Sequence, residues 1–493
     1  MIDPADFTIA EAGAALRDRV VSARELLDAA TARAANTEAH LHAFLTLDRD
    51  GARSAADAAD AAFASGEDRG PLMGIPIAVK DNMCTRGVET TAGSKILSGY
   101  SPPYDATVVT RLREAGAVIV GKTNLDEFAM GSSTENSAYG PTHNPWDPQR
   151  VPGGSSGGSA ASVAVGSSIA ALGSDTGGSI RQPAALCGIV GVKPTYGLVS
   201  RYGLIAFASS LDQIGPFAKN VADAATLLER VAAFDIHDAT SFRGERPNIS
   251  GGLDAGVAGV RVGVVKELMG EAIAPSVRAA TQRTIDRLAD AGAQIVEVSL
   301  PSFEYALSAY YLIAPAECSA NLARFDGVRY GLRVDGETTE EMMARSRAAG
   351  FGPEVTRRIL LGTYALSAGY YDAFYGQAQR VRTLVRRDFA AAYEHADVLV
   401  SPTSPSTAFP IGAKTADPLE MYYQDICTIP LNLAGDPGMS VPVATDDDGL
   451  PIGFQVMAPA LGEQAMFQVG AEVERLVGFD ARPSLATSEV TLP

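Results

Sequence analysis

Two segments rich in glycine and serine are the parts of this 493-residue sequence that could carry out covalent chemistry. Residues 153–159 read Gly-Gly-Ser-Ser-Gly-Gly-Ser, and residues 173–181 read Gly-Ser-Asp-Thr-Gly-Gly-Ser-Ile-Arg. Because glycine allows close backbone approach, Thr176, Gly177 and Gly178 can direct neighbouring N–H groups into one cavity. Such donors form an oxyanion hole, and serine hydroxyls beside an oxyanion hole are candidate nucleophiles for acyl transfer.

A serine nucleophile needs a base, and the histidines of this sequence do not supply one. Residues 153–157 match the Gly-x-Ser-x-Gly nucleophile elbow, but that motif needs a strand before the serine and a histidine after it. The preceding stretch reads as a loop, and only His237 and His395 follow. Lys80 ends a short apolar run, residues 74–79, that reads as a buried strand, so it is the candidate base. A glycine-serine loop that packs near this lysine for structural reasons alone is an open alternative.

A P-loop pattern, Gly-x-x-x-x-Gly-Lys-Thr, occurs at residues 116–123, but we do not expect phosphate binding there. A phosphate-binding loop follows a strand and opens a helix. Here the four intervening apolar residues themselves form a predicted strand, and residues 111–115 before them are helical. Histidines that could share a metal ion are limited to His40 and His42, so the sequence predicts no metal site.

Composition and charge exclude several classes of protein. Hydrophobic residues make up 46% and charged residues 20%, which is typical of a globular protein with a large core. The 40 Lys+Arg against 58 Asp+Glu give a net charge of −18, which argues against a chain that grips nucleic acid or a membrane surface by itself. The four cysteines form no Cys-x-x-Cys pair, and no signal peptide is visible. We therefore expect buried free thiols and a cytoplasmic protein.

The elements that must position the candidate residues alternate between strand and helix. Helical periodicity predicts helices over 9–35 and 50–65, and a mostly helical region over 305–395. Strands are predicted at residues 74–79, 117–120, 169–172, 261–265, 294–298, 397–400, 439–443 and 452–456. This alternation predicts an α/β fold with a central mixed, mainly parallel sheet covered by helices on both faces.

The chain resembles the amidase signature family, whose members use a Ser–cis-Ser–Lys triad. The resemblance is most specific at residues 74–81 and at the two glycine-rich segments, and it extends over nearly the whole chain. It implies that Lys80 is the base, that Ser155 is the bridging serine in a cis peptide, and that Ser179 is the nucleophile.

The resemblance also implies the amidase signature fold, as a single domain over residues 1–493. Within it we expect an N-terminal helical segment at 1–70, the core that carries the triad at 71–220, and a helical cover of the substrate pocket at 305–395.

Within the family, the chain is similar to the glutamine-hydrolysing subunits of tRNA-dependent amidotransferases. The motifs that carry this likeness lie at residues 121–140, 192–197, 207–216, 321–327 and 362–372. The likeness implies that Arg358 and Asp425 hold the substrate glutamine, with Tyr310 and Ser132 as further pocket residues. Charge supports the first pair, because a zwitterion needs a cation for its carboxylate and a carboxylate for its ammonium group.

The same likeness implies partners. In such a heterotrimer, the B subunit is a kinase and transamidase that uses ATP and Mg²⁺ and engages the tRNA, and a small C subunit joins the two large chains. This chain would bind glutamine, need no cofactor of its own and contact no membrane. One alternative is a free-standing amidase for small amides, which would keep the triad but would not need Arg358 and Asp425. A catalytically silent scaffold is another, and an intact triad argues against it.

Overall fold

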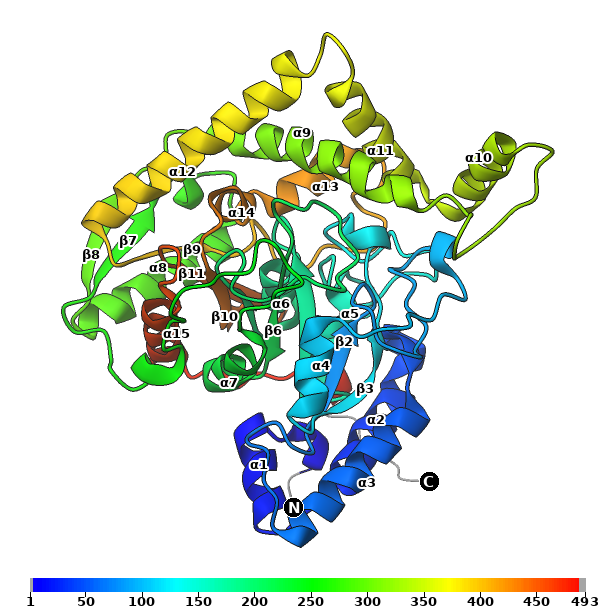
Figure 1. Ribbon diagram of the computed structural model, residues 1–493. Coiled ribbons are helices and arrows are strands. Elements are labelled where there is room, and N and C mark those ends of the chain that lie inside the picture. The colour runs from blue at the N-terminus through cyan, green and yellow to red at the C-terminus, as the bar shows by residue number, and fades with distance from the viewer. Residues whose placement is uncertain (1–2, 487–493) are drawn as a thin grey trace.

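An eleven-stranded sheet runs through the centre of the computed structural model, which describes residues 3–486, and helices pack on both faces of this sheet (Figure 1). Its strand order is β1-β3-β2-β4-β6-β5-β10-β11-β9-β7-β8. The strands are β1 (Phe44–Leu47), β2 (Pro76–Lys80), β3 (Val118–Thr123), β4 (Ala170–Asp175), β5 (Val190–Lys193), β6 (Gln213–Ala218), β7 (Arg261–Val265), β8 (Gln294–Val298), β9 (Val398–Pro402), β10 (Gly438–Thr445) and β11 (Pro451–Met457).

The sheet is mixed, as the sequence predicts, and its parallel strands form two blocks. Strands β3, β2 and β4 form one block, and β9, β7 and β8 form the other. Within residues 3–486, six of the ten neighbouring pairs are antiparallel, and they join the two blocks or add β1 at the edge. Three strands in these antiparallel pairs, β1, β5 and β6, have no counterpart among the predicted strands.

The first parallel block brings the candidate chemistry to one edge of the sheet. Every residue of β2, β3 and β4 is buried, which fits their apolar sequences. Lys80 is the last residue of β2, and it lies opposite Thr123, the last residue of β3. The second glycine-rich segment begins within β4 and continues past its carboxyl end at Asp175. Because carboxyl ends of parallel strands meet at one edge, Lys80 and Ser179 are brought to the same side.

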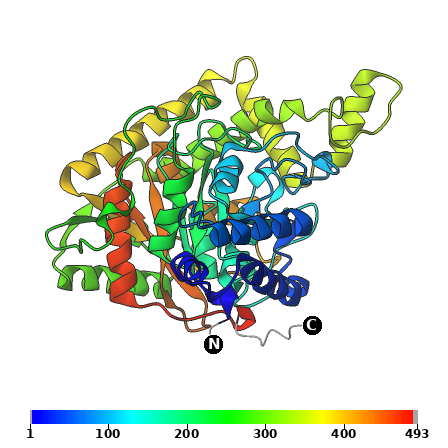
Figure 2. The same cartoon turned by 60° about the horizontal axis from the view of Figure 1, so that its bottom comes forward.

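The N-terminal helical region contains two helices where the periodicity predicts one, over residues 9–35. Helix α1 (Ile9–Arg17) and helix α2 (Ala23–Leu41) each begin at a capping box, and Ser22 caps the second. Arg19 between them has a φ of 55°, which a continuous helix does not allow. Helix α3 (Arg49–Ser65) confirms the prediction over 50–65. Figure 2 shows these helices, in blue, at the surface.

Four helices confirm the predicted helical region over 305–395 and lie along one end of the molecule (Figure 1). They are α9 (Phe303–Asn321), α10 (Thr339–Gly350), α11 (Pro353–Leu366) and α12 (Gln377–His395). Helices α9 and α11 pack closely because Gly362 has no side chain: a Cβ there would lie 1.8 Å from the carbonyl oxygen of Pro315. This approach places Arg358 of α11 beside Tyr311 of α9.

The remaining helices surround the sheet. They are α4 (Thr107–Glu114), α5 (Gly157–Val165), α6 (Arg181–Cys187), α7 (Val221–Val231), α8 (Pro275–Asp290), α13 (Pro418–Tyr422), α14 (Ile429–Ala434) and α15 (Glu463–Val477). The P-loop-like pattern forms strand β3 after helix α4, which confirms the strand predicted there. Across residues 3–486, every helix is too short or too polar to span a membrane.

Candidate active site

Lys80 lies at the centre of a buried cluster of hydroxyl groups. Its Nζ is 2.8 Å from Ser155 Oγ, 2.8 Å from Ser156 Oγ and 3.0 Å from Ser174 Oγ. Asn82 also donates to Ser174 Oγ, at 2.9 Å. The contact between Lys80 and Ser155 is one of the two that the predicted triad requires. The other, between the hydroxyls of Ser155 and Ser179, is not formed as a hydrogen bond within residues 3–486. Ser174 and Asn82 were not predicted, although Ser174 lies within the second glycine-rich segment.

The neighbouring carboxylate is held by a different lysine. Asp81 follows Lys80 directly, but its Oδ1 lies 3.0 Å from Lys122 Nζ, and both side chains are buried. Lys80 is fully buried, and its direct partners are hydroxyl groups and a carbonyl oxygen. Burial lowers the pKa of Lys80 to about 7, against the weaker opposing effect of Asp126, Asp175 and Asp212. A lysine with this pKa is partly neutral at physiological pH and can accept a proton.

The first glycine-rich segment is folded tightly around Ser155. The peptide bond between Gly154 and Ser155 is cis, as the resemblance implies. A Cβ at Gly154 would lie 2.2 Å from Asp126 Oδ2, so only glycine fits there. Ser156 N–H donates to the carbonyl oxygen of Ser179 at 3.2 Å, which ties the two glycine-rich segments together. Within residues 3–486 the Ser179 hydroxyl has no hydrogen-bond partner, and the side chain is largely buried.

The segment before Ser179 leaves two of the three predicted backbone N–H donors available. Gly178 N–H donates to Asp175 Oδ1 at 2.9 Å. The N–H groups of Thr176 and Gly177 have no hydrogen-bond partner in the described part of the chain. The structure thus leaves Thr176 and Gly177 available as oxyanion donors, and Gly178 shapes the turn with a φ of 142°.

A buried ion pair that the sequence did not reveal holds this turn. Arg181 donates to both carboxylate oxygens of Asp175 at 3.1 Å, and both side chains are fully buried. Arg181 also donates to Gln455 and Asn432, which reach it from the other half of the sheet and from α14. The opposing charge and the hydrogen bonds outweigh burial and lower the pKa of Asp175 to about 2. Asp175 is therefore ionised and fixes the oxyanion segment.

Asp425 and Ser132 lie together, as the predicted pocket requires. Ser132 Oγ donates to Asp425 Oδ2, and both side chains are buried. Burial raises the pKa of Asp425 to about 7, against the opposing effects of Ser132 and Arg358. Tyr310 lies against the oxyanion segment. A Cβ added to Gly177 would lie only 2.7 Å from the Tyr310 hydroxyl oxygen.

Arg358 is buried, whereas the side chain of its neighbour Arg357 is 45% exposed, so Arg358 is the arginine that faces the pocket. Its guanidinium carbon lies 5.3 Å from the ring centres of Tyr311 and Tyr422. Its Nε donates to Glu354 Oε1 at 2.8 Å. Glu354 was not predicted, although its position one helical turn before Arg358 is a sequence signal for such a pair.

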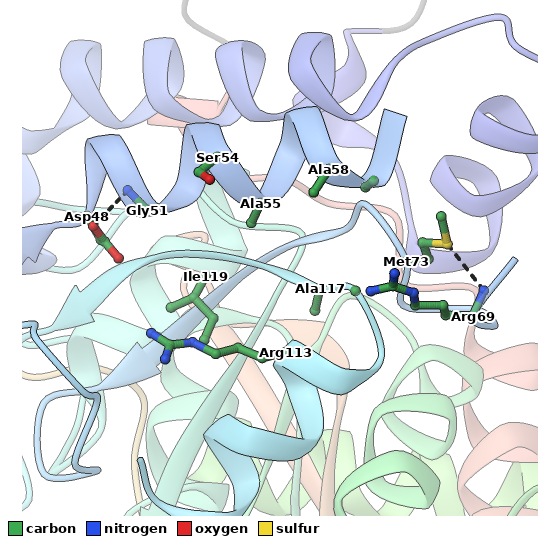
Figure 3. Close-up of a pocket in the computed structure, with 12 residues that line it drawn as sticks. Asp48, Gly51, Ser54, Ala55, Ala58, Arg69, Met73, Arg113, Ala117 and Ile119 are labelled. Carbon is green, nitrogen blue, oxygen red and sulfur yellow. Dashed lines mark hydrogen bonds between the residues drawn. The ribbon is translucent and has the colours of Figure 1, made fainter. Parts of the chain in front are cut away.

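A surface cavity of about 340 Å³ lies apart from these residues, between α3 and the first part of β3 (Figure 3). Its wall includes Asp48, Arg69, Arg113 and Ile119. Since the cavity borders the beginning of β3 and Lys80 lies level with its end, it is not part of the candidate active site. Within residues 3–486, no three or more histidine, cysteine, aspartate or glutamate side chains are grouped to hold a metal ion.

Comparison with known proteins agrees with this geometry. A family model described as Amidase matches residues 25–467. The A subunit of glutamyl-tRNA(Gln) amidotransferase from Acidothermus cellulolyticus is 60% identical over 472 residues, which cover 95% of this chain and 94% of that protein. The crystal structure of the protein of the same name from Thermotoga maritima is 41% identical with a TM-score of 0.82, covering 98% of this chain and 99% of that one. Native peptide amidase from Stenotrophomonas maltophilia is 31% identical with a TM-score of 0.83, covering 97% and 99%. The chain belongs to the amidase signature family.

Proposed function

We propose that this chain is the glutamine-hydrolysing subunit of a tRNA-dependent amidotransferase. It hydrolyses the side-chain amide of glutamine and supplies ammonia for the conversion of Glu-tRNA(Gln) to Gln-tRNA(Gln). Asp-tRNA(Asn) is a second candidate acceptor. The relatives that are 55–60% identical over nearly the whole chain are named as the A subunit of glutamyl-tRNA(Gln) amidotransferase. The peptide amidase is only 31% identical, which favours the amidotransferase over a free-standing amidase.

The observation that carries the proposal is a buried arginine and a buried aspartate beside the oxyanion segment. Glutamine is a zwitterion, so Arg358 would pair with its carboxylate and Asp425 with its ammonium group. Thr428 ties the turn that carries Asp425 to Gly177, so the ammonium site and the oxyanion donors belong to one structure. A site for simple amides would have no use for two buried charges. Tyr310 and Ser132 complete the pocket.

In the proposed mechanism, neutral Lys80 accepts a proton from Ser155 while Ser155 accepts the proton of Ser179. Ser179 Oγ then attacks the side-chain amide carbon of glutamine, and the N–H groups of Thr176 and Gly177 stabilise the oxyanion. The carbon–nitrogen bond breaks, and the proton returns through Ser155 to the leaving ammonia. A water molecule then attacks the γ-glutamyl ester on Ser179 and releases glutamate, with Lys80 and Ser155 acting again as the proton relay.

The proposal extends to partners and domain organisation. The chain works in the cytoplasm in a heterotrimer with a B and a C subunit, and the B subunit binds tRNA, ATP and Mg²⁺ and consumes the ammonia. The chain itself is one domain: residues 71–220 form the catalytic core, 305–395 cover the pocket, and 1–70 form an N-terminal helical segment. A net charge of −18 is compatible with this role, because the partner binds the tRNA phosphates.

Two measurements test the proposed function. Affinity purification of the tagged chain from its native host should yield two unrelated chains and tRNA, and purification as a lone active amidase would contradict the proposal. The purified complex should release ammonia from glutamine and far less from propionamide or benzamide. Asp425→Ala should abolish this preference, because it removes the partner of the substrate ammonium group.

A further inference from the structure

Glu354 lies beside Arg358 and accepts three hydrogen bonds. Its Oε1 accepts from Arg358 Nε at 2.8 Å and from the Tyr422 hydroxyl at 2.8 Å. Its Oε2 accepts from Arg357 Nη1. The glutamate side chain is only 10% exposed, so these bonds are shielded from water. A carboxylate with three donors in this setting has a defined orientation.

The pairing leaves one particular part of the arginine available. A guanidinium group binds a carboxylate most specifically through two parallel N–H···O bonds. Glu354 uses only Nε of Arg358, and within residues 3–486 its Nη1 and Nη2 have no hydrogen-bond partner. The two terminal nitrogens therefore form a ready pair of donors for a second carboxylate.

Three aromatic rings surround the same guanidinium. Its carbon lies 5.3 Å from the ring centres of Tyr311 and Tyr422 and 5.6 Å from that of Phe207. The rings of Tyr311 and Tyr422 stack on each other at 3.8 Å. Tyr422 thus acts twice, since its ring lies next to Arg358 and its hydroxyl donates to Glu354. An arginine that is bonded at its Nε and packed among three aromatic rings has lost most of its rotamer freedom before any ligand arrives.

We propose that Glu354, supported by the Tyr422 hydroxyl, is a positioning residue that presents the Nη1 and Nη2 atoms of Arg358 to the α-carboxylate of the substrate. This inference rests on the proposed function, because it assigns a role within glutamine recognition. The proposed role is not an effect of charge alone, because the negative charge of Glu354 repels the substrate carboxylate. Glu354 therefore favours binding only through the orientation that it imposes on Arg358.

The test uses the assembled complex with four variants of this chain. Glu354→Ala removes both acceptor oxygens, and with them all three hydrogen bonds, and should raise KM for glutamine about 10- to 100-fold while kcat changes less than about 3-fold. Glu354→Gln keeps an amide oxygen for Arg358 and should restore KM to within about 5-fold of wild type. Tyr422→Phe keeps the ring and should raise KM about 3- to 10-fold. Arg345→Ala, the control, removes an exposed arginine that pairs with Glu341 outside this cluster and should leave KM unchanged.

A second measurement separates positioning from damage to the fold. Phenylmethylsulfonyl fluoride reacts with an activated serine and has neither a carboxylate nor an ammonium group. Its rate of inactivation should be the same in all four variants and in wild type. If that rate falls as much as kcat/KM for glutamine, Glu354 is merely structural and the inference is wrong.

The other outcomes are equally decisive. An unchanged or lower KM in Glu354→Ala would overturn the inference, because it would show that orientation contributes nothing or that charge repulsion dominates. If Glu354→Ala does not fold, the kinetics of Glu354→Gln and Tyr422→Phe test the inference instead. An unchanged KM in Tyr422→Phe would then overturn the inference. A wild-type complex that hydrolyses no glutamine would contradict the proposed function itself, and this inference with it. All the other results leave the proposed function intact.

Discussion

The hydroxyl group of Thr428 donates to the carbonyl oxygen of Gly177 at 2.6 Å, although 251 positions separate the two residues. The same hydroxyl lies 3.1 Å from the carbonyl oxygen of Asp425. The threonine side chain also fills the space that Gly178 leaves, since a Cβ on that glycine would lie 2.1 Å from Thr428 Oγ1. The side chain of Thr428 therefore joins the turn that carries Asp425 to the segment that carries the oxyanion donors.

Thr428→Val should lower kcat more than it affects KM. Valine keeps the shape of threonine but leaves the Gly177 carbonyl unpaired, so the Gly177–Gly178 peptide that follows the two oxyanion donors loses a bond that fixes it. We expect kcat for glutamine to fall about 10- to 100-fold, as for a weakened oxyanion donor. Steady-state kinetics of the complex measures this. Thr428→Ser keeps the hydroxyl and should stay within about 3-fold of wild type; equal losses in both variants would assign the effect to the missing methyl group.

The pH dependence of kcat/KM should rise through neutrality, because two buried groups must each lose a proton. Burial lowers the pKa of Lys80 to about 7 and raises the pKa of Asp425 to about 7. Protonated Lys80 cannot accept the serine proton, and protonated Asp425 cannot pair with the substrate ammonium group. Below both values, log kcat/KM should therefore rise with a slope of about 2 per pH unit.

Asp425→Asn provides the control for this pH profile. With one of the two ionisations removed, the slope should fall to about 1, although the activity is lower throughout. The measurement is kcat/KM for glutamine at low substrate concentration from about pH 5.5 to 9. A flat wild-type profile across neutrality would contradict a neutral Lys80 as the base.

Ser179→Ala should abolish glutamine hydrolysis and the acyl-enzyme, because it removes the attacking oxygen. We expect kcat to fall at least about 1,000-fold, as for other enzymes that lose a nucleophile. Mass spectrometry after an acid quench should detect a γ-glutamyl adduct in wild type and none in the variant. Ser162→Ala is the matched control, because this buried serine of α5 bonds to Ser168, away from Lys80. Turnover that survives in Ser179→Ala would show that another residue attacks.

The fold could be predicted where the sequence pattern is local. The apolar run that ends at Lys80 and the two strands predicted at 261–265 and 294–298 all appear as predicted. Strands β1, β5 and β6 could not be found this way, because their stability depends on partners distant in sequence: β6, for example, pairs with β4 and β5. The break between α1 and α2 was missed because the apolar spacing continues across it, whereas the cap at Ser22 and the backbone of Arg19 decide it.

The contacts of the candidate site could also be predicted only in part. The hydroxyl of Ser155 and the amine of Lys80 meet as the resemblance implies, and so do Ser132 and Asp425. The contacts that orient these groups join residues far apart in the chain, such as Tyr422 with Glu354, and no spacing rule reveals them. The hydrogen bond of the Gly178 N–H could not be predicted either, since it depends on how the turn after β4 closes on Asp175.

Asp175→Asn should destabilise the protein and inactivate it, because it leaves Arg181 charged and buried without its carboxylate. Breaking a buried ion pair by removing one partner costs about 3–5 kcal/mol in other proteins, and we expect a similar decrease in the free energy of unfolding at pH 7. Urea denaturation measures this decrease. Glu67→Gln breaks an exposed ion pair with Arg69 and should leave the unfolding midpoint unchanged.

Acid titration tests the ion pair of Asp175 and Arg181 a second time, because the direction in which stability changes with pH is also predicted. The pKa of Asp175 is about 2 in the folded protein and has its ordinary value of 3.8 in the unfolded chain. The unfolded chain therefore binds more protons between these values, so the stability that Asp175 contributes is complete above about pH 4 and is lost as the pH falls toward 2. Wild type should lose stability faster than Asp175→Asn over this range. Parallel losses in the two proteins would show that the ionised form of Asp175 contributes no stability, and that its hydrogen bonds alone hold the turn before Ser179.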